Sequence, residues 1–353
     1  MTLPRTSATM HDIRRRPDSA IQNGREMMQM IRIAGAAALA ATMVAAPAGA
    51  ETLRIAGNFP VEHSSSMAME KFKDVVAEKS GGDLTIETFP AMQLGGAQEN
   101  VDQVRSGVIF ATWIGSAYLS QTVPELEAVS LPFAYADRAT AFRVIDGKVG
   151  EALNAKLGDS GFESLGWMEL GFRNVTNNVR PIETAGDFDG LKIRLQPNET
   201  HIATFRALGA NPVSMGISEV YSALQQGVLD GEENPYPIIE SRHFNEVQKY
   251  LSDSSHFFDY IVLVANKRKF DALSDEQKAV LRAAASEAIA WQREQSATED
   301  EVAKQALIDA GMTFTPISPE TRTELRKRTA GVVDELKAKI GPELIDMVLA
   351  ESN

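Results

Sequence analysis

The alternation of apolar and polar residues predicts strands and helices in repeated order from residue 53 onward. Segments 53–57 and 84–89 alternate with a period of two, as strands with one buried face do. Between them, apolar side chains recur every three to four residues over 64–80, which predicts a helix that ends at a glycine pair. A helix at 99–106 and an unbroken apolar run at 108–114 follow. Such a run is typical of a strand covered on both faces, so the order predicts an α/β fold with parallel strands.

The same order of strands and helices resumes near residue 163. We expect further strands at 163–167, 191–195 and 261–266, and further helices at 200–208, 218–226 and from Pro319 to the C-terminus. From Ser274, which begins a capping box with Gln277, to residue 310 there is no proline or glycine. A helix of this length measures about 55 Å, against ~30 Å for one compact domain, so we expect it to reach from one domain to another. Two shorter helices with a kink near 296–298 are the alternative.

The composition is that of an acidic protein long enough for two domains. Of 353 residues, 44% are hydrophobic and 24% are charged, and the length corresponds to about two domains. The net charge of −13 argues against nucleic acid as a partner, because binding phosphates requires clustered lysine and arginine. There is no cysteine, which excludes disulfides, thiolate metal sites and a cysteine nucleophile.

Residues 1–50 are expected to be a secretory signal peptide. The apolar run 33–46 has 14 residues, too few to span about 30 Å of hydrocarbon, and it follows two arginines. The small residues at 48–50 form a cleavage site, so we expect a periplasmic protein that begins at Glu51. A short membrane anchor is the alternative. Because the polar stretch ahead of the apolar run is long for a signal peptide, we expect the true start of translation at Met27, Met28 or Met30.

The chain lacks the sequence signatures of common hydrolases, zinc proteases and nucleotide-binding proteins. Its four histidines after residue 50 have no metal-ligand spacing, which favours surface or supporting positions for them. The adjacent carboxylates Glu232 and Glu233 point in different directions and make a poor acid–base pair. We therefore expect neither catalysis nor a cofactor or metal.

Two arginines and an amide near expected strand ends are the strongest candidates for chemistry. Arg173 follows an apolar segment, where α/β folds place ligands. Strand alternation puts Arg194 on the same side as Lys192, and Asn234 lies in an expected turn at 230–235. A guanidinium binds a carboxylate through two parallel hydrogen bonds, and an amide can satisfy its remaining lone pairs. Taken singly, each arginine is also explained by a surface ion pair.

Six segments in a fixed order give a far more specific signal than any one of these residues. They are PAMQLGGAQENVDQVRSG (90–107), AVSLPFAY (128–135), GFRNVTNNVRPI (171–182), DFDGLKIRLQPNE (187–199), ISEVYSALQQGVLDGEENP (217–235) and FNEVQKYLSDSSH (244–256). Together they resemble the substrate-binding proteins of tripartite ATP-independent periplasmic (TRAP) transporters, the family named for dicarboxylate binding. The resemblance extends from residue 51 to about 345.

The resemblance implies a two-lobed, periplasmic binding protein-like α/β fold, with a ligand cleft between the lobes and a long helix along both. Lobe I is expected to contain 51–170 with about 260–300, and lobe II about 171–259 with 301–353. Two crossing segments would form the hinge. The implied function is capture of a small organic acid and its delivery to the TRAP permease subunits, which an ion gradient drives. We expect a monomer.

The family also implies which residues bind the ligand. Members of the family grip a carboxylate with the arginine that corresponds to Arg173, supported by those that correspond to Arg194 and Asn234. The further expected ligand-binding residues are Asn58, Glu62, His63, Trp113 and Ser116. Core packing is the alternative for Trp113. Some members have an aromatic residue at the position of Ile217, and sialic-acid-binding members have an acid in the loop that contains Gly115, so the resemblance argues against sialic acid. The polar residues of the first loop suit a hydroxylated acid, so we expect a sugar acid such as a uronate or an aldonate.

Two functions of other classes remain open from the sequence. The same scaffold can carry a periplasmic enzyme, since a fold does not fix a function. It can also serve as a ligand sensor that transmits its closed shape to a membrane kinase.

Overall fold

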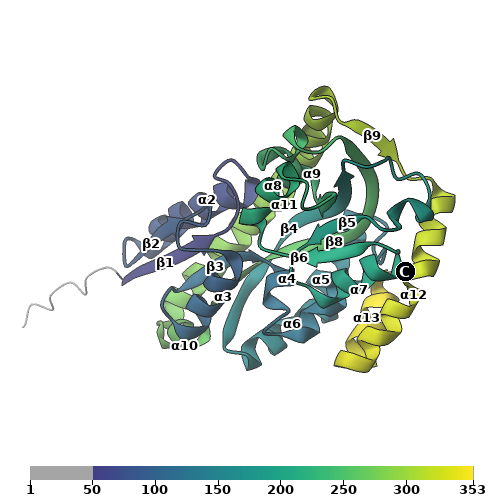
Figure 1. The fold of residues 1–353 in the computed structure, drawn as a ribbon. Helices are drawn as coiled ribbons and strands as arrows, with labels where there is room; N and C mark the ends of the chain where they lie inside the picture. The colour runs from purple at the N-terminus through teal and green to yellow at the C-terminus, as the bar shows by residue number, and fades with distance from the viewer. Residues whose placement is uncertain (1–50, 353) are drawn as a thin grey trace, which may run out of the picture. The chain divides into compact units, whose positions relative to one another are not determined.

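One mixed sheet of nine strands organises residues 51–352, the part of the chain that the computed structural model describes (Figure 1). The strands lie in the order β2 (Leu84–Phe89), β1 (Glu51–Gly57), β3 (Ala111–Gly115), β8 (Tyr250–Asn266), β4 (Phe162–Asn177), β7 (Gly231–Asn234), β5 (Lys192–Leu195) and β6 (Asn211–Ser214), and β9 (Thr313–Pro316) pairs with β8. The expected signal peptide at 1–50 lies outside the described residues. The α/β class is confirmed, but the sheet is mixed: β3 and β4 both pair antiparallel with β8, whereas β1 pairs in parallel with β2 and β3.

Helices and short strands alternate in both halves of the chain. The first half contains β1 (Glu51–Gly57), α2 (Ser64–Ser80), β2 (Leu84–Phe89), α3 (Ala97–Ser106), β3 (Ala111–Gly115), α4 (Ser116–Leu119), α5 (Arg138–Asp146) and α6 (Lys148–Asp159). The second contains β5 (Lys192–Leu195), α7 (Glu199–Ala207), β6 (Asn211–Ser214), α8 (Ile217–Gln225), β7 (Gly231–Asn234) and α9 (Tyr236–Ser241). The last elements are α10 (Lys267–Ala272), α11 (Asp275–Asp309), β9 (Thr313–Pro316), α12 (Pro319–Ile340) and α13 (Pro342–Ser352).

Two long strands, β4 (Phe162–Asn177) and β8 (Tyr250–Asn266), connect the halves. They pair antiparallel with three register shifts, one of them at Gly171, whose φ of 115° favours glycine. The sequence prediction assigned only 163–167 and 261–266 to these strands. Their other portions are rich in buried polar residues, which interrupt the apolar pattern that signals a strand.

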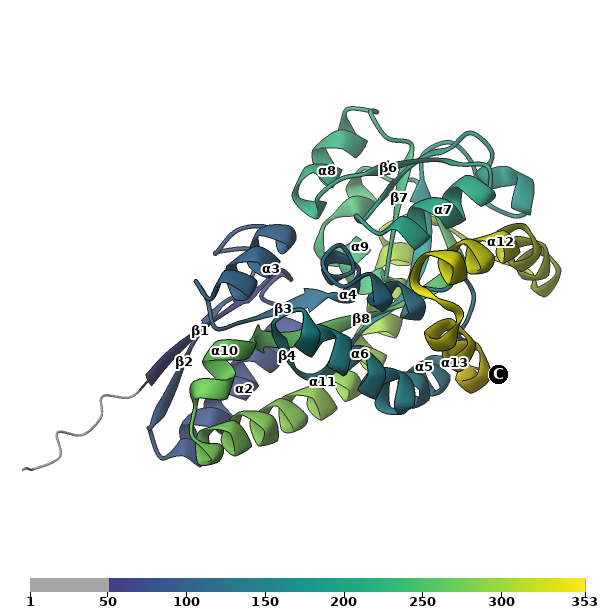
Figure 2. The same cartoon turned by 90° about the horizontal axis from the view of Figure 1, so that it is seen from below.

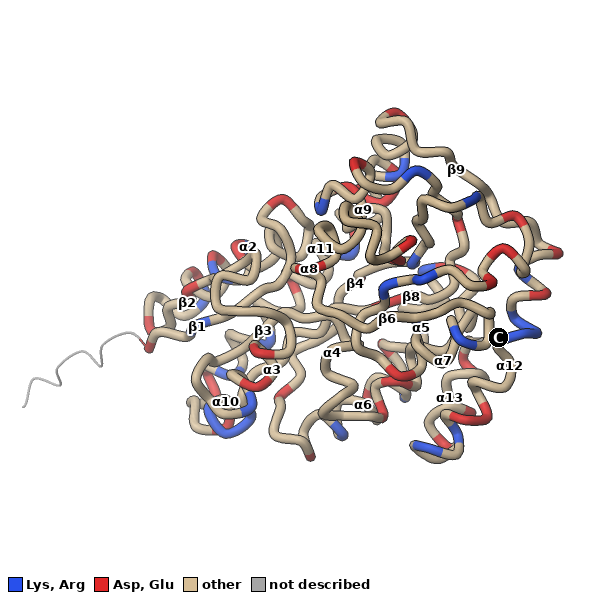
Figure 3. Tube along the Cα trace, viewed as in Figure 1, with Lys and Arg blue, Asp and Glu red and all other residues tan. Residues whose placement is uncertain are grey.

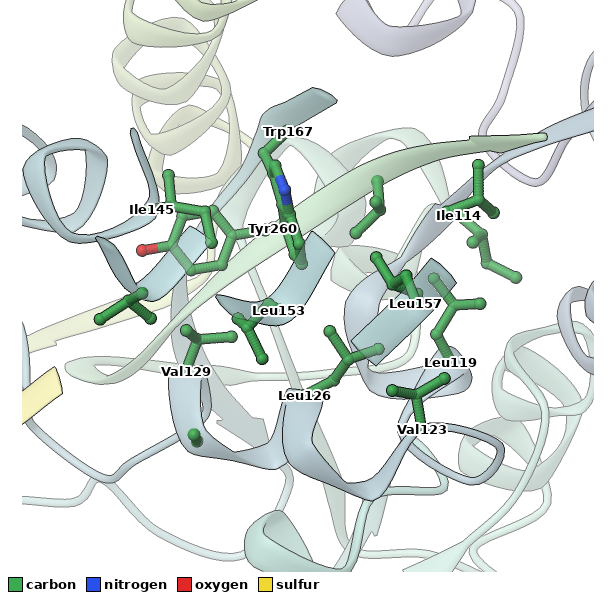
Figure 4. Close-up of a cluster of buried hydrophobic side chains, with 14 of the residues drawn as sticks. Ile114, Leu119, Val123, Leu126, Val129, Ile145, Leu153, Leu157, Trp167 and Tyr260 are labelled. Carbon is green, nitrogen blue, oxygen red and sulfur yellow. The ribbon is translucent and has the colours of Figure 1, made fainter. Parts of the chain in front are cut away.

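Four clusters of buried hydrophobic side chains hold the helices on the sheet. The largest joins β3, β4 and β8 to α5, α6 and α13 and includes Leu153, Trp167 and Tyr260 (Figure 4). A second joins β1, β2 and β3 to α2 and α11. The other two lie around β5 with α7, and around α8 with α9. Strand β8 contributes side chains to all four clusters and β4 to the first three, so both strands belong to both halves.

The expected long helix is confirmed as α11, which has 35 residues and no break (Figure 2). Its capping box between Ser274 and Gln277 is present. Leu281 packs in the cluster with α2, whereas Leu307 packs in the cluster with α8 and α9. One helix therefore contributes to the hydrophobic cores of both halves.

The single C-terminal helix that the sequence predicted is instead two helices, α12 and α13. Gly341, with φ at 89°, ends α12, and Pro342 begins α13. Ile345 and Val348 of α13 pack with α5 and α6, so the C-terminus contacts elements that the sequence prediction placed in lobe I. Charged residues of both signs lie along outer helices such as α2, α12 and α13 (Figure 3). Within residues 51–352, no helix is long and apolar enough to span a membrane.

Candidate ligand-binding site

A cavity lies where elements of both halves meet. The first half lines it from the loop after β1, the end of β3 and α4, and the second half from β5, β7, α8 and α9. The apolar part of the lining comes from Phe59, Ile114, Leu170, Ile217 and Ile238. The polar part comes from Asn58, Tyr118, Arg194, Gln196, Asn234 and Arg242. Such a cavity, mostly apolar with a few convergent polar groups, is typical of a small-molecule site.

Arg194 is a buried cation at this cavity. It lies on β5 and is only 1% exposed. Its Nε and Nη2 donate to the carbonyl oxygen of Met215 at 3.0 and 2.8 Å, and Nη2 also donates to the Tyr118 hydroxyl at 3.3 Å. Among the described residues, no carboxylate forms an ion pair with it, and its Nη1 has no hydrogen-bond partner. A buried guanidinium whose charge is not neutralised favours an anionic ligand.

Arg242 is a second cation at the same cavity, and the sequence analysis did not single it out. It follows α9, is half-buried, and donates from Nη2 to the backbone oxygen of Asn58 at 2.9 Å. Its Nε is buried without a hydrogen-bond partner in the described part of the chain. Burial lowers the pKa of Arg242, and the neighbouring charge of Arg194 acts in the same direction, whereas Tyr118 and Glu62 oppose the shift. The two guanidinium groups are therefore close enough to repel each other.

Asn234 presents an N–H donor to the cavity because charged groups behind it fix its amide. Its Oδ1 accepts from Arg173 Nη2 at 3.0 Å, and its Nδ2 donates to Glu232 Oε2 at 2.5 Å. A carbonyl oxygen suits the Arg173 cation and an N–H group in its place would not, so the reverse orientation of the amide is unfavourable. The remaining N–H on Nδ2 is the group that a ligand can use.

Gln196 and Asn58 each present an acceptor oxygen to the cavity, whereas Asn234 presents a donor. Gln196 Nε2 donates to Asp259 Oδ2 at 2.5 Å, which leaves its Oε1 for the cavity. Asn58 Nδ2 donates to Asn100 Oδ1 at 2.8 Å, and its own Oδ1 is buried with no partner among residues 51–352. A buried acceptor without a donor costs about 1–3 kcal/mol, so the Asn58 oxygen favours a ligand with a hydroxyl group, and the Gln196 oxygen can accept from a second hydroxyl group.

Arg173 lies behind the cavity and not on its wall. It is in the middle of β4, fully buried, and not at a strand end as the sequence analysis placed it, because β4 continues to Asn177. Its Nε and Nη2 donate to the two carboxylate oxygens of Glu233 at 2.5 and 2.7 Å, and its Nη1 donates to Asp259 at 3.1 Å. These two acids raise the pKa of Arg173 although burial alone would lower it. The structure thus gives Arg173 two counter-ions of its own and a hydrogen bond to Asn234.

The loop after β1 contains two of the other expected residues. Glu62 is exposed. His63 is buried as the N-cap of α2, where its side chain accepts from the backbone N–H of Ser65, and its ring stacks on Phe59 at 4.9 Å. Neither lines the cavity, although His63 supports the Phe59 ring that does.

Trp113 and Ser116 are buried next to β3 and do not line the cavity either. The indole of Trp113 contacts Phe72 of α2 edge to face, with 6.0 Å between ring centroids, and lies in the hydrophobic cluster of that helix. The Ser116 hydroxyl is buried without a partner in the described chain. Of the eight expected residues, the structure brings together Asn58, Arg194 and Asn234 at the cavity wall.

Two of the missed residues, Gln196 and Arg242, differ in how easily the sequence could have revealed them. Gln196 is two positions after Arg194, so strand alternation already places both on the same side. Arg242 falls between two of the recognised segments, 217–235 and 244–256, and no periodicity marks it. Asn234 was expected in a turn but lies at the end of a short strand, β7.

The burial of the charged groups behind the cavity can be tested by the pH dependence of stability, because Glu232 has a raised pKa. Burial raises its pKa to about 7 from an ordinary value of 4.5. Between these values the unfolded chain ionises Glu232 while the folded protein keeps it protonated, so its contribution disfavours folding increasingly as pH rises. We expect the free energy of unfolding of Glu232→Gln, relative to that of the parent, to increase by on the order of 3 kcal/mol from pH 4.5 to pH 8. Urea unfolding at the two pH values measures this difference.

The glutamine fits because it can donate to the Thr176 hydroxyl, whose own proton has Gln248 Oε1 as an acceptor at 3.0 Å. The control is Glu335→Gln on the exposed face of α12. An equal stability difference at both pH values would show that folding does not raise the pKa of Glu232.

A cavity lined by both halves of a mixed sheet, mostly apolar with arginines and amides on its wall, is typical of a protein that binds a small solute. No group of His, Asp or Glu suited to a metal ion occurs in residues 51–352. The family model of the bacterial extracellular solute-binding proteins, family 7 (DctP), matches residues 55–339. The chain belongs to this family, and it is a solute-binding protein of the TRAP transporter type, as the sequence resemblance implied.

Characterised relatives support this assignment. The chain is 35% identical over 288 residues to the 2,3-diketo-L-gulonate-binding periplasmic protein YiaO of Escherichia coli, covering 82% of this chain and 87% of that protein. It is 32% identical over 282 residues to the C4-dicarboxylate-binding periplasmic protein DctP of Rhodobacter capsulatus, covering 79% and 84%. Proteins of this family bind small acidic ligands and work with TRAP permease subunits.

Solved structures confirm the two-lobed fold. The sugar acid binding protein DctPAm from Advenella mimigardefordensis, in complex with galactonate, has a TM-score of 0.83 and 33% identity and covers 86% of this chain and 98% of its own. A TRAP periplasmic solute binding protein from Sulfitobacter sp. NAS-14.1, with bound β-D-galacturonate, has a TM-score of 0.82 and 29% identity and covers 86% and 100%.

Proposed function

We propose that this protein captures a sugar acid in the periplasm and delivers it to the membrane subunits of a TRAP permease. The observation that carries the proposal is the pairing, in one cavity, of an unneutralised arginine with acceptor oxygens. Arg194 and the Asn234 N–H hold the ligand carboxylate. Asn58 Oδ1 and Gln196 Oε1 accept from its hydroxyl groups.

The acceptor oxygens distinguish a sugar acid from a plain dicarboxylate. An ionised dicarboxylate such as succinate has no O–H to donate, so it would leave the buried Asn58 oxygen unpaired and give the Gln196 oxygen no donor. Solved neighbours at 29–33% identity with bound galactonate, β-D-galacturonate, β-D-glucuronate and D-erythronate support a hydroxylated acid. A neighbour at 28% identity holds succinate, so the scaffold itself accepts both classes.

Both halves of the sheet line the cavity, so a bound ligand contacts both and favours the arrangement in which they are close together. We propose that the two halves are lobes that close over the ligand, with bending at the register shifts of β4 and β8 near Gly171. Closure excludes water, which strengthens the interaction between Arg194 and a carboxylate. No chemical step is needed for this role.

A titration panel tests the proposed ligand class. We expect galactonate, gluconate, galacturonate or glucuronate to bind with heat change and to raise the melting temperature, because a ligand at 100 times its Kd adds about 2.7 kcal/mol to stability. Succinate serves as the control acid without hydroxyl groups and is expected to bind at least tenfold more weakly. Tighter binding of succinate than of every hydroxylated acid would exclude a sugar acid.

Export provides a separate test of the proposed location. We propose that the chain is processed before Glu51 and acts as a periplasmic monomer. Intact mass spectrometry of the periplasmic fraction is expected to show a protein that begins at this residue. Recovery of the protein only in the cytoplasm, or of the unprocessed chain in the periplasm, would contradict the proposal.

A further inference from the structure

The cavity contains more positive charge than one carboxylate neutralises. Arg194 and Arg242 both line it, and in residues 51–352 neither forms an ion pair. Arg173 also lies close by, but Glu233 and Asp259 neutralise it. The wall that a ligand meets therefore has two free cationic groups.

The two cations come from different elements of the fold. Arg194 extends from β5 and is fixed by the Met215 carbonyl oxygen and Tyr118. Arg242 comes from the end of α9 and is fixed by one hydrogen bond to the backbone of Asn58. Fixed independently, the two guanidinium groups can hold two separate anionic groups of one ligand.

Residues 51–352 offer no strong internal partner for Arg242. Its unpaired Nε is buried. The acid with an attractive effect on it is Glu62, which is exposed in the loop after β1 and forms no ion pair with it. Tyr118 also faces it, but its hydroxyl already accepts a hydrogen bond from Arg194. A half-buried cation next to a second cation is unfavourable unless an anion joins it.

We propose that the ligand is a sugar acid with two carboxylates, an aldarate, whose first carboxylate binds Arg194 and whose second binds Arg242. The inference rests on the proposed function and narrows its ligand class. The acceptor oxygens of Asn58 and Gln196 then serve the hydroxyl groups between the two carboxylates. Every unpaired polar group of the cavity wall has a counterpart in such a molecule.

Matched pairs of acids test the second carboxylate. We use isothermal titration at pH 7.5 with galactarate against galactonate, glucarate against gluconate, and tartrate against threonate, so that each pair differs at one terminal group. We expect the diacid to bind at least tenfold more tightly than the monoacid in the pair of the right length. Arg242→Gln is expected to weaken the diacid by roughly 30-fold or more, and the monoacid by much less, because it removes one partner of a desolvated charge pair.

Two further variants separate charge from folding. Arg242→Lys keeps the charge and is expected to retain part of the preference for the diacid. Arg326→Gln removes an exposed arginine of α12, so it changes net charge equally and is expected to leave both affinities unchanged. Melting temperatures of all variants without ligand show whether each is folded.

The outcomes distinguish the two levels of the proposal. If monoacids bind as tightly as diacids in every pair, or if Arg242→Gln weakens both members equally, the second carboxylate site is wrong while the sugar-acid function stands. If a folded parent protein binds none of the acids, the proposed function fails and the inference fails with it.

Discussion

Replacement of Arg194 by alanine is expected to weaken ligand binding by roughly 30-fold or more while the protein stays folded. The guanidinium is buried at the cavity wall, and Met215 and Tyr118 fix its position without neutralising it. Loss of one partner of a buried, hydrogen-bonded charge pair typically costs about 2–5 kcal/mol, or roughly 30-fold to several thousand-fold in affinity. Among residues 51–352 no acid forms an ion pair with Arg194, and its charge only partly opposes the burial that raises the pKa of Glu232, so the fold is expected to tolerate the change.

Calorimetric titration with the best sugar acid of the panel measures this effect. Arg194→Lys is expected to restore little, because an ammonium group cannot form two parallel hydrogen bonds to a carboxylate. Lys192→Gln is the matched control, since Lys192 is on the same strand and the same side but is exposed. A folded Arg194→Ala protein that binds within threefold of the parent would show that another group holds the carboxylate.

The sequence predicted the types of most elements because their local patterns are regular. Short strands and helices with one apolar face, and the long helix with its capping box at Ser274, follow from periodicity and end signals alone. The lengths of β4 and β8 did not follow, because their inner portions are buried polar residues that local rules assign to loops. Those residues are tolerated inside because tertiary partners satisfy them.

The site was predictable in its chemistry but not in which arginine faces the ligand. Arg173 and Arg194 are equivalent in sequence, since each is a cation within an apolar segment. They differ in the structure because Arg173 donates hydrogen bonds to Glu233 and Asp259, which are 60 and 86 positions away in the sequence. Such distant partners leave no local pattern. Arg242 was missed for the same reason, since only the folded chain brings the end of α9 to Asn58.

Arg173 is expected to matter for stability more than for direct contact with the ligand. Arg173→Met leaves Glu233 and Asp259 buried without their cation. Breaking a buried ion pair by removing one partner typically destabilises a protein by about 3–5 kcal/mol. His256, whose Nε2 is 3.0 Å from Glu233 Oε2, is the remaining group that can partly compensate.

The destabilisation caused by Arg173→Met is expected to be smaller at acidic pH. Arg173 contributes most to holding the pKa of Glu233 below its ordinary value of 4.5, although burial acts to raise it. The stability from this pair is therefore fully present above pH 4.5 and is lost as pH falls below that value. In Arg173→Met the pair is absent, so the difference from the parent shrinks in acid.

Urea unfolding of the parent and of Arg173→Met at pH 7 and at pH 3.5 measures both effects. We expect the destabilisation at pH 7 to exceed that at pH 3.5, and Glu233→Gln to recover part of it when added to Arg173→Met, because the buried negative charge is removed. Affinity of the folded fraction is expected to fall less than in Arg194→Ala, since Arg173 acts through the Asn234 amide that it orients. If Arg173→Met were as stable as the parent but unable to bind any acid, Arg173 would contact the ligand directly in a rearranged site. That result would return the carboxylate clamp to the position that sequence resemblance assigned to it.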